Sequence, residues 1–251
     1  DEKSKMKILF AACNAKYIHS NLAVFNLKAY AKEYDSQVVL REYTINQLKD
    51  DILKDIYRCH PDVVCVSCYI WNITFVRELM QDLRKILPDV PFWAGGPEVS
   101  YDAETFLGKN PAFNGVMVGE GEETFLELLK HYVDGSVTLE ETRGLVYRKA
   151  DGALQNNGWR QLMDLSKVPF AYENLEDFEN RIIYYESSRG CPFSCSYCLS
   201  SIDKKLRFRD INLVKKELQF FLDHKVPQVK FVDRTFNCKH DHAMAIWQYI
   251  K

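Results

Sequence analysis

The sequence predicts an α/β protein whose amino-terminal part is a five-stranded, doubly wound parallel sheet. Short apolar runs alternate with amphipathic segments over residues 6–133, as strands alternate with crossover helices in such a sheet. Pro61, Pro88, Pro91 and Pro111 lie near the ends of the amphipathic segments, where proline cannot continue a helix. A length of 251 residues with 47% hydrophobic residues allows a buried core and excludes disordered and low-complexity classes.

Each of the five predicted strands is a short apolar run. They span residues 7–13, 37–43, 62–69, 91–96 and 115–120. Helices are predicted in the amphipathic segments that separate and follow the strands. They lie near residues 21–34, 46–58, 73–87, 102–108 and 122–133. Together these elements form the first predicted domain, residues 6–140.

The pattern changes in the segment that follows. Residues 144–165 contain two alternating runs around Asp151-Gly152, a pair that favours a tight turn, and they predict a β-hairpin rather than a crossover unit. Residues 164–180 contain Pro169 and several acidic residues, which is typical of a linker. We assign the hairpin and linker together to residues 141–180.

A second domain is predicted over residues 181–251. It begins with a strand at 181–190 and continues through a cysteine-rich loop. A helix near 213–224, a strand at 228–236 and a helix from about residue 241 follow. The alternation again predicts βα units.

Charge and hydropathy exclude several kinds of partner. The 33 Lys and Arg residues nearly balance the 35 Asp and Glu residues, and the net charge of −2 gives no strong field to attract nucleic acid or an anionic membrane. No apolar run approaches the roughly 20 residues that span a bilayer. Residues 1–5 are charged, unlike the start of a secretory signal. We therefore predict a cytoplasmic protein with no membrane or nucleic-acid partner.

Three cysteines with CxxxCxxC spacing follow the first strand of the second domain. They are Cys191, Cys195 and Cys198. Three closely spaced thiolates can hold three corners of an iron–sulfur cubane and leave one iron without a protein ligand. The alternatives are redox or buried thiols, and a structural zinc site, which needs a fourth ligand. For zinc, that ligand would come from Cys238, His240 or His242.

This motif resembles the signature of the radical S-adenosylmethionine (SAM) enzymes, with the aromatic Tyr197 just before the last cysteine. The resemblance implies a 4Fe-4S cluster on the three cysteines and SAM chelated to the fourth iron, with Tyr197 near the adenine. It also implies an electron donor such as flavodoxin or ferredoxin. Asp233 and Arg234 occupy positions that often hold the methionyl end of SAM, and a salt-bridged strand end is the alternative interpretation of this pair.

The amino-terminal half resembles the cobalamin-binding, Rossmann-like domain of cobalamin-dependent radical SAM enzymes. The Gly-Gly-Pro at residues 95–97 and the Gly-Glu-Gly-Glu-Glu-Thr at residues 119–124 carry this resemblance. Membership of this class would imply a partial TIM barrel of about six βα units after the cobalamin-binding domain. Residues 181–251 hold only the first two of these units. We therefore expect this segment to be the amino-terminal part of a truncated radical SAM domain, with a cluster site that is disordered or empty.

Ligands of doubly wound sheets bind beyond the carboxyl ends of the strands, so the cobalamin contacts are predicted there. Glycines in these loops can let a large macrocycle or its nucleotide tail approach the backbone, although ordinary tight turns would also explain them. The candidate contacts are Asn14, Tyr17, His19, Ser20, Ser67, Tyr69, Asn72, Gly95, Gly96, Pro97, Glu98, Gly119, Gly121, Glu122 and Thr124.

The usual cobalt-binding DxHxxG motif is absent from the sequence, although His19 follows the first strand. We therefore predict that no histidine ligates cobalt and that the benzimidazole base is displaced, with its tail buried in the crevice at the carboxyl end of the sheet. Ser67, Tyr69 and Asn72 are the candidates for the lower face of the corrin ring. For His19, a polar contact and a solvent-exposed loop histidine are both open.

The resemblance favours a radical SAM enzyme that transfers a methyl group to an unactivated carbon, or that performs related radical chemistry such as ring contraction. One alternative is a methylthiotransferase, whose second cluster would need cysteines from the first domain. The cysteines available for it are Cys13, Cys59, Cys65 and Cys68. Another alternative is a noncatalytic cobalamin-binding module. The sequence does not identify the substrate.

Overall fold

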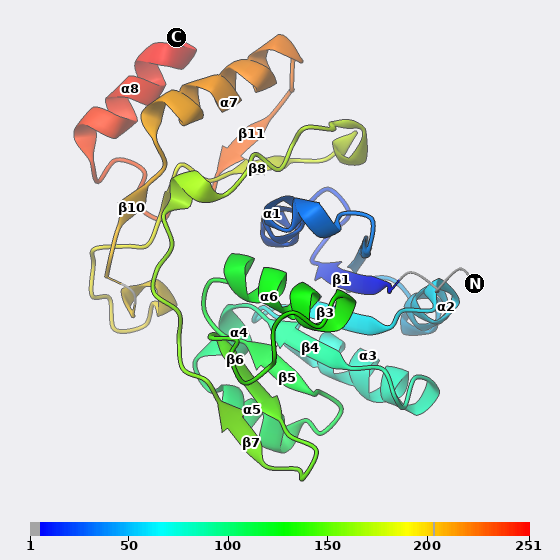
Figure 1. Ribbon diagram of the computed structural model, residues 1–251. Coiled ribbons are helices and arrows are strands. Elements are labelled where there is room, and N and C mark those ends of the chain that lie inside the picture. Colours follow the sequence, from blue (N-terminus) through cyan, green and yellow to red (C-terminus); the bar gives the residue numbers. More distant parts are fainter. Residues whose placement is uncertain (1–5, 203) are drawn as a thin grey trace. The chain divides into compact units, whose positions relative to one another are not determined.

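The computed structural model describes residues 6–202 and 204–251 (Figure 1). The chain forms two compact units that divide between Leu162 and Met163. The charged residues 1–5, which argued against a secretory signal, lie outside the described residues. No helix in the described ranges combines the length and apolar character needed to cross a membrane.

The first unit is built on a seven-stranded sheet in the order β2-β1-β3-β4-β5-β6-β7. The strands are β1 (Ile8–Asn14), β2 (Val38–Thr44), β3 (Val63–Ser67), β4 (Phe92–Gly95), β5 (Gly115–Met117), β6 (Leu145–Arg148) and β7 (Leu154–Asn156). The first five are parallel, which confirms the predicted fold class. The hairpin strands β6 and β7 extend this same sheet by antiparallel pairing with β5. This pairing covers an edge of β5 that would otherwise expose unpaired backbone groups.

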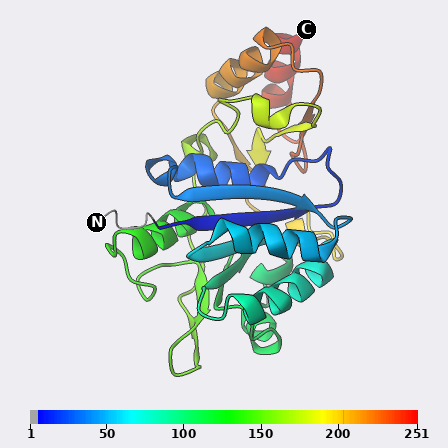
Figure 2. The same cartoon turned by 90° about the vertical axis from the view of Figure 1, so that its right-hand side faces the viewer.

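Helices cover both faces of the first sheet (Figure 2). They are α1 (Leu22–Tyr30), α2 (Lys49–Cys59), α3 (Ile73–Ile86), α4 (Pro97–Ser100), α5 (Ala103–Lys109) and α6 (Glu122–Val133), with a 3-10 turn at Lys32–Tyr34. α1 and α6 pack on one face, and α2 to α5 pack on the other. α4 was not predicted. It begins with Pro97, which has the backbone φ that a first helical turn requires.

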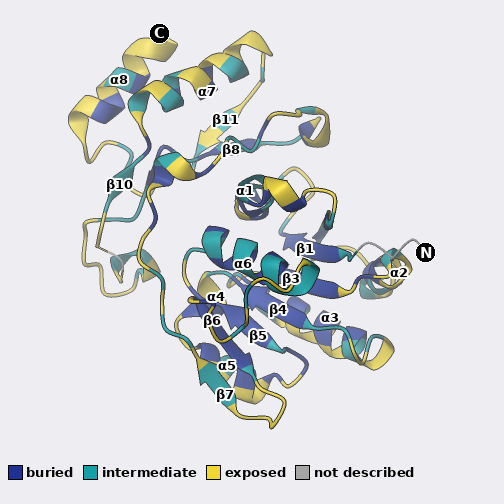
Figure 3. Cartoon of the chain, in the orientation of Figure 1, coloured by how far each residue is buried: buried dark blue, intermediate teal, exposed yellow. Residues whose placement is uncertain are grey.

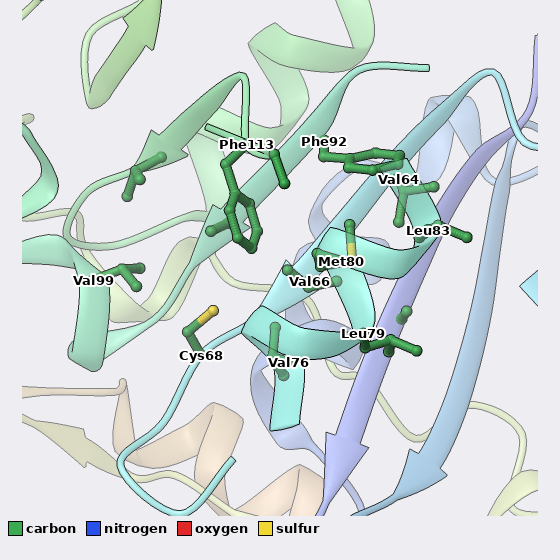
Figure 4. Packing of buried hydrophobic residues seen from close by; sticks show 14 of the residues in the cluster. Val64, Val66, Cys68, Val76, Leu79, Met80, Leu83, Phe92, Val99 and Phe113 are labelled. Atoms are coloured by element: carbon green, nitrogen blue, oxygen red, sulfur yellow. The ribbon is translucent and has the colours of Figure 1, made fainter. Parts of the chain in front are cut away.

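The core of the first unit follows from the alternation of side chains along its strands. Leu9 and Ala11 of β1 belong to the cluster that packs against α2, α3 and α5, part of which Figure 4 shows. Ile8 and Phe10, one position out of phase, pack against α1 and α6. β1, β3, β4 and β5 are buried along their whole length because helices cover both faces (Figure 3).

The second unit contains two small sheets and two helices. β8 (Ile183–Tyr185) pairs in parallel with β11 (Val229–Phe231), and β9 (Ser188–Arg189) pairs in antiparallel fashion with β10 (Arg207–Phe208). The helices are α7 (Ile211–Asp223) and α8 (His240–Ile250), with 3-10 turns at Leu165–Lys167, Glu176–Phe178 and Leu199–Ser201. The predicted strand at 181–190 is therefore divided into β8 and β9.

Candidate functional site

The candidate site lies where β1 and β3 end, at the carboxyl edge of the first sheet. These neighbouring strands lead to α1 and α3, which cover opposite faces of the sheet. The chain therefore diverges at this point, which is the topological switch point at which doubly wound folds bind ligands. Residues 14–21 and 67–72 form the two loops.

Glu42 of β2 holds both ends of the loop after β1. Its Oε1 accepts a hydrogen bond from Asn14 Nδ2 at 2.8 Å and another from the backbone N–H of Asn21 at 2.9 Å. Asn14 Nδ2 also donates to the carbonyl of His19 at 3.0 Å. The sequence analysis missed Glu42, whose only signal was a carboxylate near the end of an otherwise largely apolar strand.

A second polar network joins the loops after β1 and β3. Asn21 Nδ2 donates to Ser67 Oγ at 3.1 Å, and Tyr69 OH donates to Asn21 Oδ1 at 3.4 Å. Asn72 donates to the carbonyls of Cys13 and Ser67, both at 3.0 Å, and accepts from the Tyr69 N–H at 2.7 Å. The predicted residues Ser67, Tyr69 and Asn72 are therefore brought together. Asn72 is fully buried, and its hydrogen bonds link the loop after β3 to the end of β1.

Large apolar side chains lie exposed around this buried network. Tyr17 is 68% exposed, Ile70 79% and Trp71 51%, and Ile18 is also exposed. The Trp71 ring stacks on Tyr69, with ring centroids 4.3 Å apart and an interplanar angle of 11°. Exposed apolar side chains on two loops that share a buried polar network indicate a site for a large, flat, mostly apolar ligand. Ser20 of the first loop is buried, and His19 is half-buried.

Of the two glycines at the end of β4, contacts within the fold explain Gly96 but not Gly95. Gly96 has φ of 108°, and a Cβ there would lie 2.4 Å from the carbonyl oxygen of Cys68. A Cβ on Gly95 would make only an ordinary contact with Met117, at 3.6 Å. Gly96 therefore allows β3 and β4 to approach at their exits, whether or not a ligand is present. Pro97 and Glu98, which follow in α4, are exposed.

The residues after β5 pack mostly against other parts of the first unit. A Cβ on Gly119 would lie 3.0 Å from the Trp159 ring, and one on Gly121 would lie 3.1 Å from Leu27. Thr124 is fully buried, and its Oγ1 accepts a hydrogen bond from Arg160 Nε at 2.8 Å. Glu122 is also buried. The contacts of Gly119 and Thr124 with residues 159–160 were not anticipated from the sequence.

The CxxxCxxC segment forms a loop between β9 and the 3-10 turn at Leu199–Ser201 in the second unit. Cys191 and Cys198 are half-buried, Cys195 is exposed, and all three are free thiols. Tyr197 is 92% exposed. Within residues 6–202 and 204–251, no group of three or more His, Cys, Asp or Glu side chains is placed to hold a metal ion. The described geometry thus gathers neither the cluster ligands nor those of the alternative zinc site.

Asp233 joins the ends of the two parallel strands of the second unit. Its Oδ1 accepts hydrogen bonds from Ser187 Oγ and Ser188 Oγ, both at 2.6 Å, and its Oδ2 accepts from the Ser187 N–H at 3.1 Å. The hydrogen-bond partners of Asp233 are thus serines that follow β8. The next residue, Arg234, is exposed.

The cysteines of the first unit are in surroundings that favour neutral thiols. Cys13, Cys65 and Cys68 are buried, and burial raises the pKa of Cys13 to about 12 and raises the pKa of the other two as well. Since metal clusters bind thiolates, these three residues are poor candidates for a second cluster. Cys59 is half-buried near the end of α2.

Comparison with known protein families places the first unit beside a cofactor-binding domain. Residues 8–129 match the model of the B12 binding domain. The match contains β1 to β5 and the exit loops described above, and it ends within α6.

Two relatives of known sequence illustrate the similarity. The chain is 27% identical to the cobalamin-dependent radical SAM methyltransferase TokK of Streptomyces tokunonensis, over 92% of this chain and 36% of TokK. It is 28% identical to the uncharacterized methyltransferase PH0819 of Pyrococcus horikoshii, over 80% of this chain and 46% of that protein. The chain thus spans less than half the length of either relative.

Solved structures share the fold. The cobalamin-dependent SAM radical enzyme OxsB, solved with aqua-cobalamin and SAM, superposes with a TM-score of 0.77 at 18% identity, over 98% of this chain and 37% of that one. The radical SAM methyltransferase TsrM of Kitasatospora setae, solved with cobalamin and a [4Fe-4S] cluster, gives a TM-score of 0.75 at 16% identity. That match covers 98% of this chain and 52% of TsrM.

Proposed function

We propose that the chain binds cobalamin at the carboxyl edge of its first sheet. The support is the match of residues 8–129 to the B12 binding domain, together with the similarity of the chain to a cobalamin-dependent radical SAM methyltransferase. The observation that carries the proposal is a set of exposed apolar side chains, here called the apolar rim, on the two loops that a buried polar network joins. The apolar rim consists of Tyr17, Ile18, Ile70 and Trp71. The rim provides the apolar surface that a corrin ring covers, and it lies within the residues that match the family.

Residues in and beside the two loops would have different roles in holding the cofactor. Glu42 keeps the loop after β1 in one conformation, and Asn72 does the same for the loop after β3. Ser67 and Tyr69 lie at the β3 exit, where we propose that they face the lower side of the corrin. We also propose that no histidine ligates cobalt.

Equilibrium binding of aquocobalamin tests this site. Trp71→Ala removes the outer ring of the stacked pair and is expected to weaken binding about tenfold, since an aromatic contact contributes about 0.5–1.5 kcal/mol beyond its area. Tyr57→Ala, an equally exposed aromatic on α2, is the matched control and should leave binding unchanged. An equal loss of aquocobalamin affinity in both variants would contradict the proposed position of the site. His19→Ala should leave the visible spectrum of bound cobalamin unchanged, and a shift would reveal histidine ligation.

For the second unit we propose that Cys191, Cys195 and Cys198 hold a 4Fe-4S cluster when iron and sulfide are supplied. When bound, such a cluster with SAM supplies one-electron chemistry that makes an alkyl radical. The chain's own contribution is three thiols on one loop that at least partly reach solvent, with Tyr197 exposed beside them. Asp233 orders the backbone after β8, next to that loop in the sequence.

Anaerobic reconstitution tests the cluster. A broad iron–sulfur absorption band should appear in the wild-type chain and disappear when Cys191, Cys195 and Cys198 are all replaced by Ala. Cys238→Ala, which removes another exposed thiol, should retain the band. A band that persists in the triple variant would overturn the assignment, and cobalamin binding without any band would favour a noncatalytic cobalamin-binding module.

We propose methyl transfer as the reaction of the whole protein, with flavodoxin or ferredoxin as the class of reductant. The support is that relatives named as methyltransferases align over most of this chain. The methylthiotransferase alternative has less support, because the buried thiols Cys13, Cys65 and Cys68 are poorly suited to hold a second cluster.

A further inference from the structure

The segment predicted to be a linker, residues 164–180, packs largely within the second unit. Its buried side chains include Leu165, Val168, Tyr172 and Phe178. The Tyr172 ring contacts the rings of Phe178 and of Phe221 in α7, with centroids 4.8 Å and 5.5 Å away. A segment with several buried contacts moves with the unit that it packs against, so the connection between the two units lies before it.

On the side of the first unit, the chain is held as far as Arg160. Its Nε donates to Thr124 Oγ1 at 2.8 Å, and its guanidinium pairs with Glu127, both in α6. The ring of the preceding residue, Trp159, lies so close to Gly119 that a Cβ on that glycine would be 3.0 Å from it. These contacts make residue 160 part of the first unit.

On the side of the second unit, the chain is held from Met163 onward. Met163 is buried, and its carbonyl accepts a hydrogen bond from Arg207 Nη1 at 2.8 Å. The carbonyl of Leu165 accepts from Arg209 Nη1 at 2.7 Å. Hydrogen bonds from charged donors are stronger than those between neutral groups, and Arg209 is itself buried, so these contacts fix the backbone at both positions.

Gln161 and Leu162 lie between these two sets of contacts. Both are exposed, and they belong to no helix or strand. Neither makes a hydrogen bond or an ion pair with another residue in the described part of the chain. Two such residues have four soft backbone dihedrals, and hinges often consist of a few residues that absorb a change in φ and ψ. We propose that Gln161 and Leu162 are a hinge about which the two units reorient as rigid bodies.

The hinge has a consequence for chemistry that rests on the proposed function. If the first unit binds cobalamin and the second holds the cluster, rotation at residues 161–162 changes how closely the two cofactors approach. Neither unit has to unfold for this motion, because the hydrogen bonds of Arg160 and Arg207 lie on either side of the hinge and stay intact.

The experiment uses the 251-residue chain without cofactors. Residual dipolar couplings of the backbone N–H groups are measured in a weakly aligning medium, because they average over motions from picoseconds to milliseconds, which includes hinge motion. The couplings of each unit are expected to fit their own alignment tensor, with a smaller magnitude for the second unit, which is the smaller of the two. The couplings of Gln161 and Leu162 should fit neither tensor.

Two variants of one residue separate backbone freedom from side-chain contact. Leu162→Pro fixes φ at residue 162 and restricts Gln161, so the two tensors should be closer in magnitude than in the wild type. Leu162→Ala removes the side chain, leaves the dihedrals free and should preserve the wild-type difference.

Two further variants locate the end of the hinge. Arg207→Ala releases the carbonyl of Met163 and should lengthen the hinge, so that the coupling of Met163 also fits neither tensor. Lys167→Ala removes an exposed cation of the same unit and should leave the coupling of Met163 in the tensor of the second unit.

The other outcomes overturn the hinge. One tensor that fits every coupling of the wild-type chain would mean that the two units form one rigid body. Couplings of residues 164–180 that fit neither tensor would place the joint in that segment instead. Unchanged tensors in Leu162→Pro, or an equal change in Leu162→Ala, would mean that backbone freedom at residue 162 does not permit the motion. Because no cofactor is present, failure of the hinge leaves the proposed function intact, and failure of cobalamin binding leaves the hinge intact.

Discussion

Gly96 illustrates how a residue predicted as a cofactor contact can also be required by the fold itself. Its position after β4 suggested room for a cofactor, but the close contact that a Cβ would make is with the carbonyl of Cys68. The sequence places a glycine in the loop without saying which atoms surround it, because those atoms come from β3, nearly 30 positions earlier in the chain. Only the paired strands reveal them.

Replacing Gly96 with Ala should therefore destabilise the protein even without cofactor. A positive φ is strained for alanine, and the Cβ would overlap the carbonyl of Cys68, so the free energy of unfolding should fall by about 2 kcal/mol or more. Gly108→Ala is the matched control, since Gly108 lies in α5 with open space around a Cβ, and this change should stabilise by about 0.5–1 kcal/mol. Urea unfolding measures both, and equal effects would contradict the explanation.

Glu42 shows the opposite case, a site residue without a motif. Its carboxylate accepts from Asn14 and from the Asn21 backbone, so Glu42→Ala leaves two donors at the loop without this partner. The expected cost is about 1–3 kcal/mol in the free energy of unfolding, together with weaker aquocobalamin binding because the loop after β1 loses its order. Glu33→Ala, at an exposed position of the first unit, should change neither quantity. Unaltered cobalamin binding in Glu42→Ala would show that the loop does not hold the cofactor.

At the scale of elements, the parallel strands and their helices could be predicted because each carries its own apolar pattern. The predicted strand at 7–13 is β1 at Ile8–Asn14, and the predicted helix at 122–133 is α6 itself. The pairing of the hairpin with β5 depends on contacts distant in the sequence, so the pattern did not indicate it. The division of the predicted strand at 181–190 also depends on distant partners, since β8 pairs with β11 and β9 pairs with β10.

The hydrogen bond between β8 and α7 predicts how the stability of the second unit depends on pH. Tyr185 of β8 donates to Glu217 of α7 at 2.5 Å, and Arg209 Nε donates to the same carboxylate oxygen at 2.9 Å. Burial first, and then the charge of Glu217, raise the pKa of Tyr185 above its ordinary value near 10. The unfolded chain therefore loses this proton first. The resulting stability is complete below about pH 10 and falls as the pH rises further, by up to about 1.4 kcal/mol per unit.

Tyr185→Phe should remove this contribution. The free energy of unfolding, measured in urea from pH 8 to pH 11, should fall less steeply above pH 10 in the variant than in the wild type. At pH 8 the variant should be less stable, because Glu217 loses a buried hydrogen bond. An identical slope in both proteins would mean that Tyr185 ionises as readily in the folded protein as in the unfolded one.

For the whole molecule, the sequence predicts a hairpin and linker over residues 141–180, and the structure divides the chain within this segment, between Leu162 and Met163. Residues 145–156 read as a hairpin before a linker, yet they complete the first sheet. Trp159 and Arg160 then pack on Gly119 and α6, so the first unit continues to Leu162. Local patterns cannot show this, because the partners of these residues in β5, in α6 and at Gly119 lie 28 or more positions away.

This division predicts that cobalamin binding resides in the first unit alone. Residues 1–162 contain the complete seven-stranded sheet and the apolar rim, so this segment should fold and bind aquocobalamin within about threefold of the whole chain's affinity. A segment ending at residue 140 should be less stable and bind aquocobalamin more weakly. It lacks β6 and β7, which exposes the edge of β5, and it lacks Arg160, the hydrogen-bond donor to Thr124. Equilibrium dialysis and thermal unfolding of the two segments distinguish these cases. Equal binding by the shorter segment would show that the hairpin and the residues after it are dispensable, and loss of binding by residues 1–162 would assign part of the cobalamin site to the second unit.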